Sequence, residues 1–274
     1  MKPVSYGFIF VLGFLCLSTY ADEAEIKPVL TARQIMEASN EVDTGDNAVQ
    51  DIMMTVIGKG GSERPHDIAT FRKKTGANGK DLESVLFFRS PAKDRNIALL
   101  AYDYDDSRLA DKQWMYLPSI RKTKQLAGKT KSSAFMSSDF SYADLAIRDP
   151  DNYSYKLLRE EVLNNQKVWV IEGKPVNDDE LDETGYLRSV IYIRQDNFIA
   201  IRSENDLKRG NRKKIMDVTQ LEQIDGIWVP MELVMKTYKT DVFLGKTVMR
   251  TTSIKFNQNL SNHLFSKASI EHGL

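Results

Sequence analysis

The sequence holds few of the residues that commonly carry enzyme chemistry. It has one cysteine, Cys16, and three histidines, no two of which show the H-x-x-x-H spacing of a helical zinc motif. A zinc site would need scattered carboxylates, and one cysteine cannot form a disulfide within the chain. Neither a G-x-S-x-G nucleophile elbow nor a complete phosphate-binding loop occurs. These absences argue against an enzyme and against a bound metal or cofactor.

The chain also lacks an excess of charge and a long apolar run. Its 38 basic and 38 acidic residues give a formal net charge of zero, which argues against a nucleic-acid partner. The apolar stretch at residues 6–17 is too short for the roughly 20 residues that span a bilayer. It follows Lys2 and precedes the small-x-small sequence Thr19-Tyr20-Ala21. We therefore expect residues 1–21 to be a Sec signal peptide, and residues 22–274 to be a soluble periplasmic protein.

What the chain does have is a repeated β pattern. Runs of branched and aromatic residues alternate with Gly, Pro, Asn and Asp, which predicts about a dozen strands, joined mostly by short turns and therefore antiparallel. Thr31 should cap a helix that ends near Asn40, and Ser141 with Asp144 should cap a short helix from Tyr142. No linker divides the chain, so we expect one domain. The predicted strands are 49–57, 68–74, 82–89, 97–102, 114–117, 153–160, 167–172, 187–194, 198–204, 214–224, 228–238 and 247–256.

Alternation within the strands predicts a sheet with one apolar face. Met231, Leu233 and Met235 alternate with Glu232 and Lys236, so the two sets point to opposite sides. A sheet of this many strands must close or be covered to bury its apolar face. Two short helices leave part of that face uncovered, and the remaining apolar cavity is a place where a lipid can bind.

One region, residues 114–145, joins an aromatic strand, a basic segment and a capped turn. The strand stops at Pro118, and five cations without an acid follow between Arg121 and Lys131. This region resembles the outer-membrane lipoprotein-sorting proteins of the LolA-like superfamily, especially the branch associated with RND-type exporters. The chain departs from the pattern at two positions. Ser137 replaces a glycine, and because glycine adopts a left-handed backbone most easily, such a backbone is in question there. Ala143 replaces a glutamate. The matching residues are Trp114, Tyr116, Leu117, Pro118, Arg121, Lys122, Phe135, Met136, Ser138, Asp139, Phe140, Tyr142, Asp144 and Leu145.

The resemblance continues in residues 225–230, 259–260 and 264–265, and so spans about residues 30–266. It implies a mainly β (α+β) fold: a curved, incompletely closed antiparallel sheet, or half-barrel, wrapped around a few short helices. It also implies a periplasmic carrier that passes a lipid or lipoprotein acyl chain between an inner-membrane RND-type transporter and the outer membrane or an acceptor protein. A sensor of mislocalised lipid or lipoprotein is the alternative, and a structural accessory of the exporter with a filled core is a third possibility.

The residues of this pattern have competing interpretations. The aromatic and methionine side chains line the lipid cavity or simply form the core. We expect the cations of residues 121–124, in preference to those of residues 208–214, to contact a partner or lipid headgroups. The competing interpretation is that both runs are solvated loops. Asp144 is expected to be a helix cap, and Asp139 has no assigned role. We expect residues 178–183 to form an acidic hairpin loop rather than a calcium site. We expect residues 127–138 to be a hinge or lid. The candidate cavity residues are Trp114, Tyr116, Phe135, Met136, Phe140, Tyr142, Met231, Leu233 and Met235, and the candidate contact residues are Arg121, Lys122 and Lys124.

Overall fold

The structure is a computed structural model that describes residues 30–106 and 108–274, so the expected signal peptide lies outside the described residues. Residues 31–274 form one compact unit. Within the described ranges, 13 strands form a single antiparallel sheet in the order β6-β5-β4-β3-β2-β1-β13-β12-β11-β10-β9-β8-β7. The strands are β1 (Asn47–Gly58), β2 (Glu63–Thr75), β3 (Asp81–Ser90), β4 (Ala98–Asp103), β5 (Lys112–Leu117), β6 (Lys122–Leu126), β7 (Tyr153–Leu163), β8 (Gln166–Pro175), β9 (Tyr186–Arg194), β10 (Ala200–Leu207), β11 (Arg212–Ile224), β12 (Ile227–Lys239) and β13 (Val242–Phe256).

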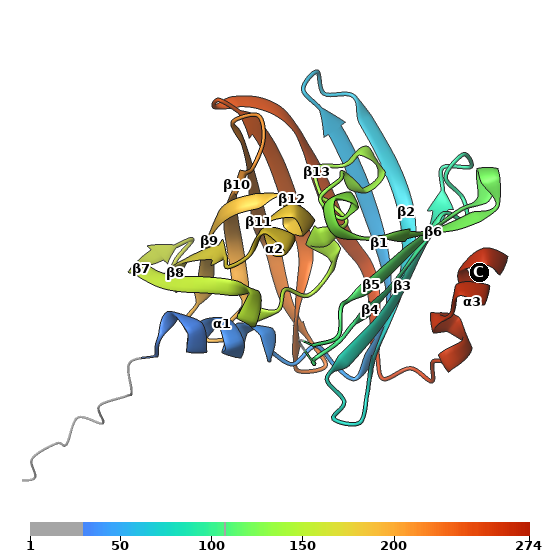
Figure 1. Ribbon diagram of the computed structural model, residues 1–274, viewed down its shortest axis with the longest axis horizontal. Coiled ribbons are helices and arrows are strands. Elements are labelled where there is room, and N and C mark those ends of the chain that lie inside the picture. The colour runs from blue at the N-terminus through green and yellow to red at the C-terminus, as the bar shows by residue number, and fades with distance from the viewer. Residues whose placement is uncertain (1–29, 107) are drawn as a thin grey trace, which may run out of the picture. The chain divides into compact units, whose positions relative to one another are not determined.

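The sheet is strongly curved and open. The first strand, β1, pairs with the last strand, β13, and this pair lies in the middle of the sheet. Met54 of β1 is opposite Met249 of β13. The free edges are β6 and β7, which do not pair with each other, so the sheet does not close into a barrel (Figure 1). The predicted half-barrel is therefore confirmed.

Short helices lie on both sides of the sheet. On its inner, concave side lie α1 (Ala32–Asn40), α2 (Asp178–Thr184) and an irregular segment, residues 127–147, which we call the cover segment (Figure 1). The predicted cap of α1 is confirmed, because Gln34 N donates to Thr31 Oγ1 at 3.2 Å and Thr31 N donates to Gln34 Oε1 at 2.9 Å. On the outer side, α3 (Lys267–His272) packs against β4, β5 and β6.

Two of the predicted loops are regular elements. Residues 178–183 were expected to be a hairpin loop, but they belong to α2, which Asn177 caps through its Oδ1 and Glu180 N at 2.8 Å. Its three acidic residues in the first turn favour a helix because they face the positive end of the helix dipole. The basic segment after Pro118 contains β6, whose cations are tolerated because an edge strand exposes them to water.

Apolar side chains pack on both faces of the first half of the sheet. On the inner face, Met54, Ile68 and Phe88 form a cluster with residues of the cover segment. On the outer face, Phe87 and Leu100 form a second cluster with residues of the C-terminal segment that contains α3. The inner face is thus covered by the chain itself. None of the helices in residues 30–106 and 108–274 is both long and apolar enough to cross a membrane.

Candidate functional site

The cover segment has little regular structure. It contains three single 3-10 turns, η2 (Gly128–Thr130), η3 (Phe135–Ser137) and η4 (Ala143–Leu145). Met136 and Ser137 both have positive φ angles, of 48° and 59°, so the left-handed backbone that the missing glycine put in question is present. Backbone bonds hold it, because Ser138 N donates to Phe135 O and Phe135 N to Phe140 O, both at 2.8 Å. Because the segment has so little regular structure, its conformation depends on its contacts with the sheet.

Its apolar contacts fill the inner face of the first half of the sheet. Phe135 is 1% exposed and its ring lies 5.7 Å from that of Phe88 and 5.6 Å from that of Tyr142. Tyr142 reaches β5, where its hydroxyl contacts Met115 Sδ at 3.2 Å. Met136 packs against the same cluster. The protein's own side chains therefore occupy the position that an apolar ligand would take.

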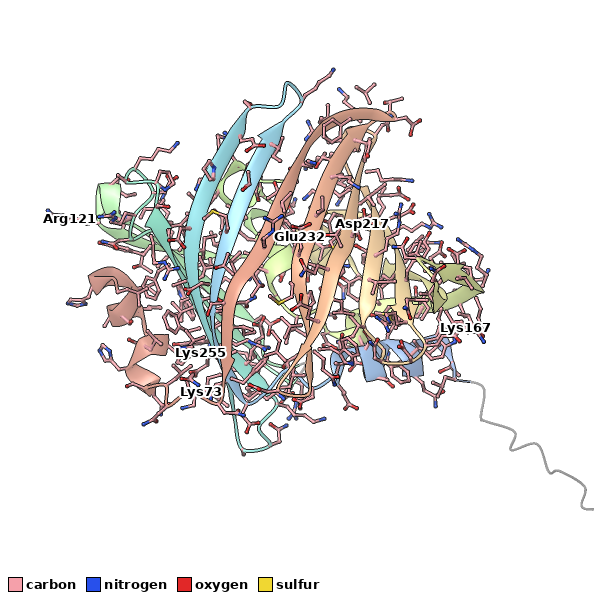
Figure 2. The ribbon with its side chains drawn as sticks, turned by 180° about the vertical axis from the view of Figure 1, so that it is seen from behind. Lys73, Arg121, Lys167, Asp217, Glu232 and Lys255 are labelled. Atoms are coloured by element: carbon pink, nitrogen blue, oxygen red, sulfur yellow. The ribbon has the colours of Figure 1, made fainter. Side chains whose placement is uncertain are left out.

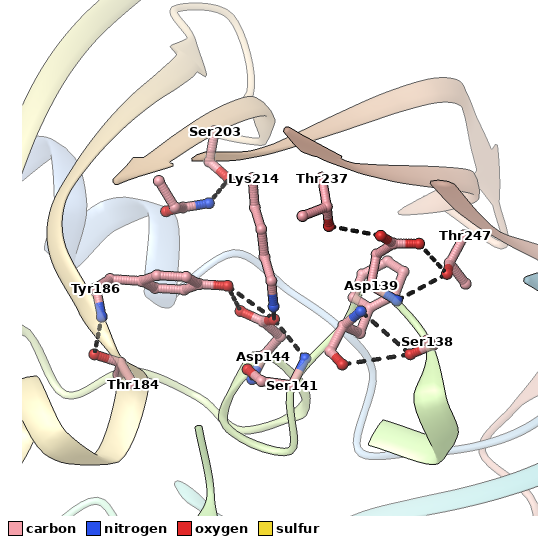
Figure 3. Close-up of polar contacts among 12 residues, drawn as sticks. Ser138, Asp139, Ser141, Asp144, Thr184, Tyr186, Ser203, Lys214, Thr237 and Thr247 are labelled. Atoms are coloured by element: carbon pink, nitrogen blue, oxygen red, sulfur yellow. Dashed lines mark hydrogen bonds and ion pairs between the residues drawn. The ribbon is translucent and has the colours of Figure 1, made fainter. Parts of the chain in front are cut away.

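Asp139, which the sequence left without a role, is the first polar tie between the cover segment and the sheet. Its carboxylate accepts hydrogen bonds from Thr237 Oγ1 on β12 at 2.6 Å and from Thr247 Oγ1 on β13 at 2.7 Å (Figure 3). Its backbone nitrogen also donates to Thr247 Oγ1 at 2.9 Å. The partners are about 100 residues away in sequence, and no local motif marks them.

Asp144 is the second tie, and it does more than the predicted capping. The capping bonds are present, with Ser141 N donating to Asp144 Oδ2 at 2.8 Å and Asp144 N to Ser141 Oγ at 3.2 Å. The turn begins at Ala143 instead of Tyr142. The carboxylate, only 6% exposed, also accepts from the Tyr186 hydroxyl at 2.9 Å (Figure 3).

Two cations complete the cluster around Asp144. Lys214 Nζ on β11 lies 3.6 Å from one carboxylate oxygen and an Arg148 guanidinium nitrogen lies 3.7 Å from the other. Burial alone would lower the pKa of Arg148, but the neighbouring Tyr153 and Asp144 outweigh it and the pKa is raised. Burial raises the pKa of Tyr186 well above its usual value, so its hydroxyl remains a donor. Because Asp144, Lys214 and Tyr186 are largely buried, their pairing matters more than it would at the surface.

The inner face is therefore divided into two parts. Toward β1–β5 it is apolar, and toward β9–β13 it presents the polar groups that hold Asp139 and Asp144 (Figure 3). The cover segment contacts both parts. Apolar packing places it, and polar bonds hold it closed, among them the partly buried bonds of Asp139 and Asp144 and the bond from Gln113 Nε2 to Tyr142 O at 3.3 Å.

The predicted cavity residues do not lie together. Phe135, Met136 and Tyr142 lie in the inner cluster, and Phe140 is buried at 4% exposure within the cover segment. Trp114 and Tyr116 lie instead in the outer cluster, where the Lys267 ammonium of α3 lies 4.5 Å above the Trp114 ring. Strand alternation explains the split, because Met115, between them, points inward.

The other predicted group, on β12, faces inward as expected. Glu232 and Lys236 form ion pairs with Arg250 and Asp217 on the outer side. Met231, Leu233 and Met235 alternate with them and share the face of Thr237, which contacts Asp139. Met235 is 2% exposed, and Met231 packs with a further inner cluster that includes Phe256.

The predicted contact cations lie at the free edge formed by β6. Arg121, Lys122 and Lys124 are all exposed, and Figure 2 shows Arg121 at this end of the sheet. In the register of β5 with β6, Lys124 lies opposite Met115 and Lys122 opposite Leu117. Residues that are opposite in register point to the same side, so both lysines stand at the rim of the inner face.

Two pockets are prominent, and charged side chains are among the lining residues of both. One of about 280 Å³ lies between the cover segment, the end of α2 and the β10–β11 hairpin, and Lys208, Arg212 and Lys214 are among its lining residues. Residues 208–214, interpreted from sequence as a solvated loop, therefore form part of a concave surface. The other pocket, of about 250 Å³, is lined by residues that include Glu83 and Asp103. Neither is the expected apolar cavity, because the cover segment fills that part of the inner face.

Asp103 is a buried carboxyl group at the end of β4. It is 7% exposed, and burial together with the nearby Asp111 raises its pKa to about 7. Among the described residues its Oδ1 has no hydrogen-bond partner. The neutral form therefore suits the folded state better than the charged form.

The Asp103→Asn variant is expected to be more stable than the wild type at pH 8 and nearly equal to it at pH 4. The folded pKa lies above the usual value of 3.8, so the contribution of the neutral carboxyl is fully present below pH 3.8 and is lost as the pH rises through 7. The rise in pKa from 3.8 to about 7 corresponds to about 4 kcal/mol, which is the upper limit of the difference in the free energy of unfolding between the two proteins. Urea unfolding at pH 4, 6 and 8 measures the difference. A gap between the two proteins that does not change with pH would contradict this assignment.

Comparison with known proteins gives a consistent picture of the fold. A family model described as "Uncharacterized protein" matches residues 80–272, and no curated protein matches the chain. A DUF1329 family protein from Desulfovibrio piger is 26% identical, with a TM-score of 0.78 over 87% of this chain and 97% of that one. A putative outer membrane lipoprotein-sorting protein domain from Vibrio parahaemolyticus is 21% identical (TM-score 0.77, 88% and 98% covered). A LolA superfamily protein from Nitrosomonas europaea is 18% identical (TM-score 0.66, 88% and 99% covered).

The family match covers more than half of the chain, and the structural matches cover nearly all of their partners. The open antiparallel sheet with few helices is the architecture that these structures share with it. The chain therefore belongs to the family of this model, and it shares its half-barrel fold with the lipoprotein-sorting and LolA superfamily structures.

Proposed function

We propose that this protein is a carrier that binds an acyl chain of a lipid or lipoprotein between the inner face of the sheet and the cover segment. One observation carries the proposal: the apolar inner face is covered by a segment whose regular structure is limited to single 3-10 turns and an isolated bridge, where a long helix or strand would make a permanent core. The ligand takes the place of Phe135 and Tyr142, and the methionines of β12 adapt to it. The described conformation is then the closed, unloaded one.

The energetics favour transfer from one binding surface to another. Burying a methylene group stabilises by roughly 0.8 kcal/mol, so shielding a 15-carbon chain is worth on the order of 12 kcal/mol before costs. Release into water is then too slow to be useful, and the carrier must pass its ligand to an acceptor of comparable affinity. The protein's part is binding and release, without covalent chemistry.

The cellular setting follows from the signal peptide expected at residues 1–21 and from the superfamily. A relative of similar structure is described as a putative outer membrane lipoprotein-sorting protein domain, which suits a periplasmic carrier. We assign the donor to an inner-membrane RND-type transporter and the acceptor to the outer membrane or a protein there. In this proposal, Lys122 and Lys124, exposed at the rim of the inner face, and the neighbouring exposed Arg121 contact anionic headgroups or an acidic partner surface.

Photo-crosslinking with a palmitoylated peptide tests where the acyl chain binds. A photoreactive amino acid at Met136, on the inner face, is expected to crosslink the peptide, whereas the same amino acid at Tyr116, on the outer face, is not. The unacylated peptide is the matched control and should give no crosslink at either position. Equal crosslinking at both positions, or crosslinking of the unacylated peptide, would contradict an inner apolar site.

A further inference from the structure

The pocket beside the cover segment carries mostly positive charge. Five cations and one carboxylate, Asp182, line it, so the lining charge is 5 − 1 = +4 in a chain of zero net charge. Ser132 and Ser133 also line the pocket. Its volume of about 280 Å³ lies near the lower end of the roughly 300–1,000 Å³ of small-molecule sites, enough for a small charged group. The five cations are Lys129, Lys208, Arg209, Arg212 and Lys214.

The ion pairs of the protein leave part of this charge without a counterion. Asp182 is shared between Lys129 at 3.3 Å and Lys208 at 2.8 Å. Within residues 30–106 and 108–274, neither Arg209 nor Arg212 has a carboxylate within 4.0 Å. Like charges gathered in a concave site produce a local positive potential that attracts anions.

We propose that this pocket binds a phosphate group, carried by a lipid headgroup or by a soluble phosphate ester. Two arginines suit phosphate because the guanidinium group donates two parallel hydrogen bonds to its oxygens, and lysines add charge without that directionality. The pocket lies between the cover segment and the β10–β11 hairpin, so a bound phosphate stands beside the proposed acyl site.

The pocket shares two residues with the tie that holds the cover segment closed. Tyr186 and Lys214 line the pocket, and both contact Asp144 of the cover segment (Figure 3). A phosphate that contacts Lys214 competes with Asp144 for the same ammonium group. Phosphate binding therefore weakens one tie, and opening of the cover segment strengthens phosphate binding in return. This coupling rests on the proposed carrier function, whereas the phosphate site itself does not.

Calorimetric titration at constant ionic strength tests the site, with inorganic phosphate and dihexanoyl phosphatidic acid as probes. The Arg209→Gln/Arg212→Gln variant is expected to bind the effective probe at least about tenfold more weakly than the wild type. The Lys167→Gln/Lys255→Gln variant loses the same two charges from exposed positions away from the pocket and is expected to bind normally (Figure 2). Binding of phosphatidic acid alone identifies a lipid headgroup, and binding of inorganic phosphate identifies a soluble source.

Two outcomes overturn the proposal: no binding of either probe at millimolar concentration, or equal weakening in the two variants. An uncharged palmitoylated peptide separates this proposal from the carrier function. If it binds and the phosphate probes do not, the pocket assignment fails and the carrier stands. If the phosphate probes bind and the uncharged acyl ligand does not, the carrier fails and the phosphate site stands.

Discussion

Replacing Asp144 with alanine is expected to lower the free energy of unfolding by about 3–5 kcal/mol, because it leaves the buried Lys214 and the partly buried Arg148 without this counterion. Arg148 and Lys214 both contact this carboxylate, and Tyr186 donates to it. The variant also loses the hydrogen bond that the carboxylate accepts from Ser141 N, which is worth about 1 kcal/mol by itself. Urea unfolding at neutral pH measures the loss.

Two controls make the result specific. Glu63→Ala removes an exposed carboxylate on β2 and should change the stability by less than about 0.5 kcal/mol. Adding Lys214→Met to the Asp144→Ala variant removes one of the unpaired charges and should restore part of the stability. A loss below about 1 kcal/mol for Asp144→Ala would mean that water solvates the cluster and that Asp144 is only a helix cap.

A disulfide between cysteines at positions 139 and 247 is expected to abolish uptake of an acyl ligand. Thr247 Oγ1 lies 2.7 Å from the Asp139 carboxylate and 2.9 Å from the Asp139 backbone nitrogen, so the backbone at 139 is close to the side chain at 247 and the pair is a candidate for a disulfide. The native Cys16 lies in the expected signal peptide, and expression of the variant from residue 22 onward leaves it out. The oxidised form holds the cover segment on the sheet, and binding of a fluorescent fatty acid should fall by at least about tenfold.

The reduced form of the same variant is the matched control. It lacks the hydrogen bonds from Thr237 and Thr247 to Asp139, so its cover segment is less firmly held and binding should equal or exceed that of the wild type. Thr247→Cys alone should be insensitive to the oxidant. Normal uptake by the oxidised double variant would show that the ligand enters without movement of the cover segment.

The sheet could be predicted from sequence because local signals specify it. Branched and aromatic residues at alternate positions gave most of the strands, and Thr31 marked the start of α1. The acidic helix α2 and the edge strand β6 were missed because charged residues suggested loops in both places. The capping bonds of Ser141 with Asp144 were predictable because the two residues are three apart.

The site was less predictable because it is built from distant residues. Asp139 meets Thr237 and Thr247, and Asp144 meets Tyr186 and Lys214, and neither set has a spacing that a sequence motif records. Trp114 and Tyr116 belong to the same motif as Phe135, yet alternation along β5 turns them to the other face of the sheet. A motif shows which residues occur together, whereas the sheet decides which of them meet.

The most direct test of an acyl-chain carrier is the native mass of the protein isolated from its own cells without detergent. We expect a population with one acyl-bearing molecule per chain, which exchanges onto an added palmitoylated peptide. A single mass that corresponds to the processed chain alone, in a protein that also fails to bind the palmitoylated peptide, would contradict the carrier function.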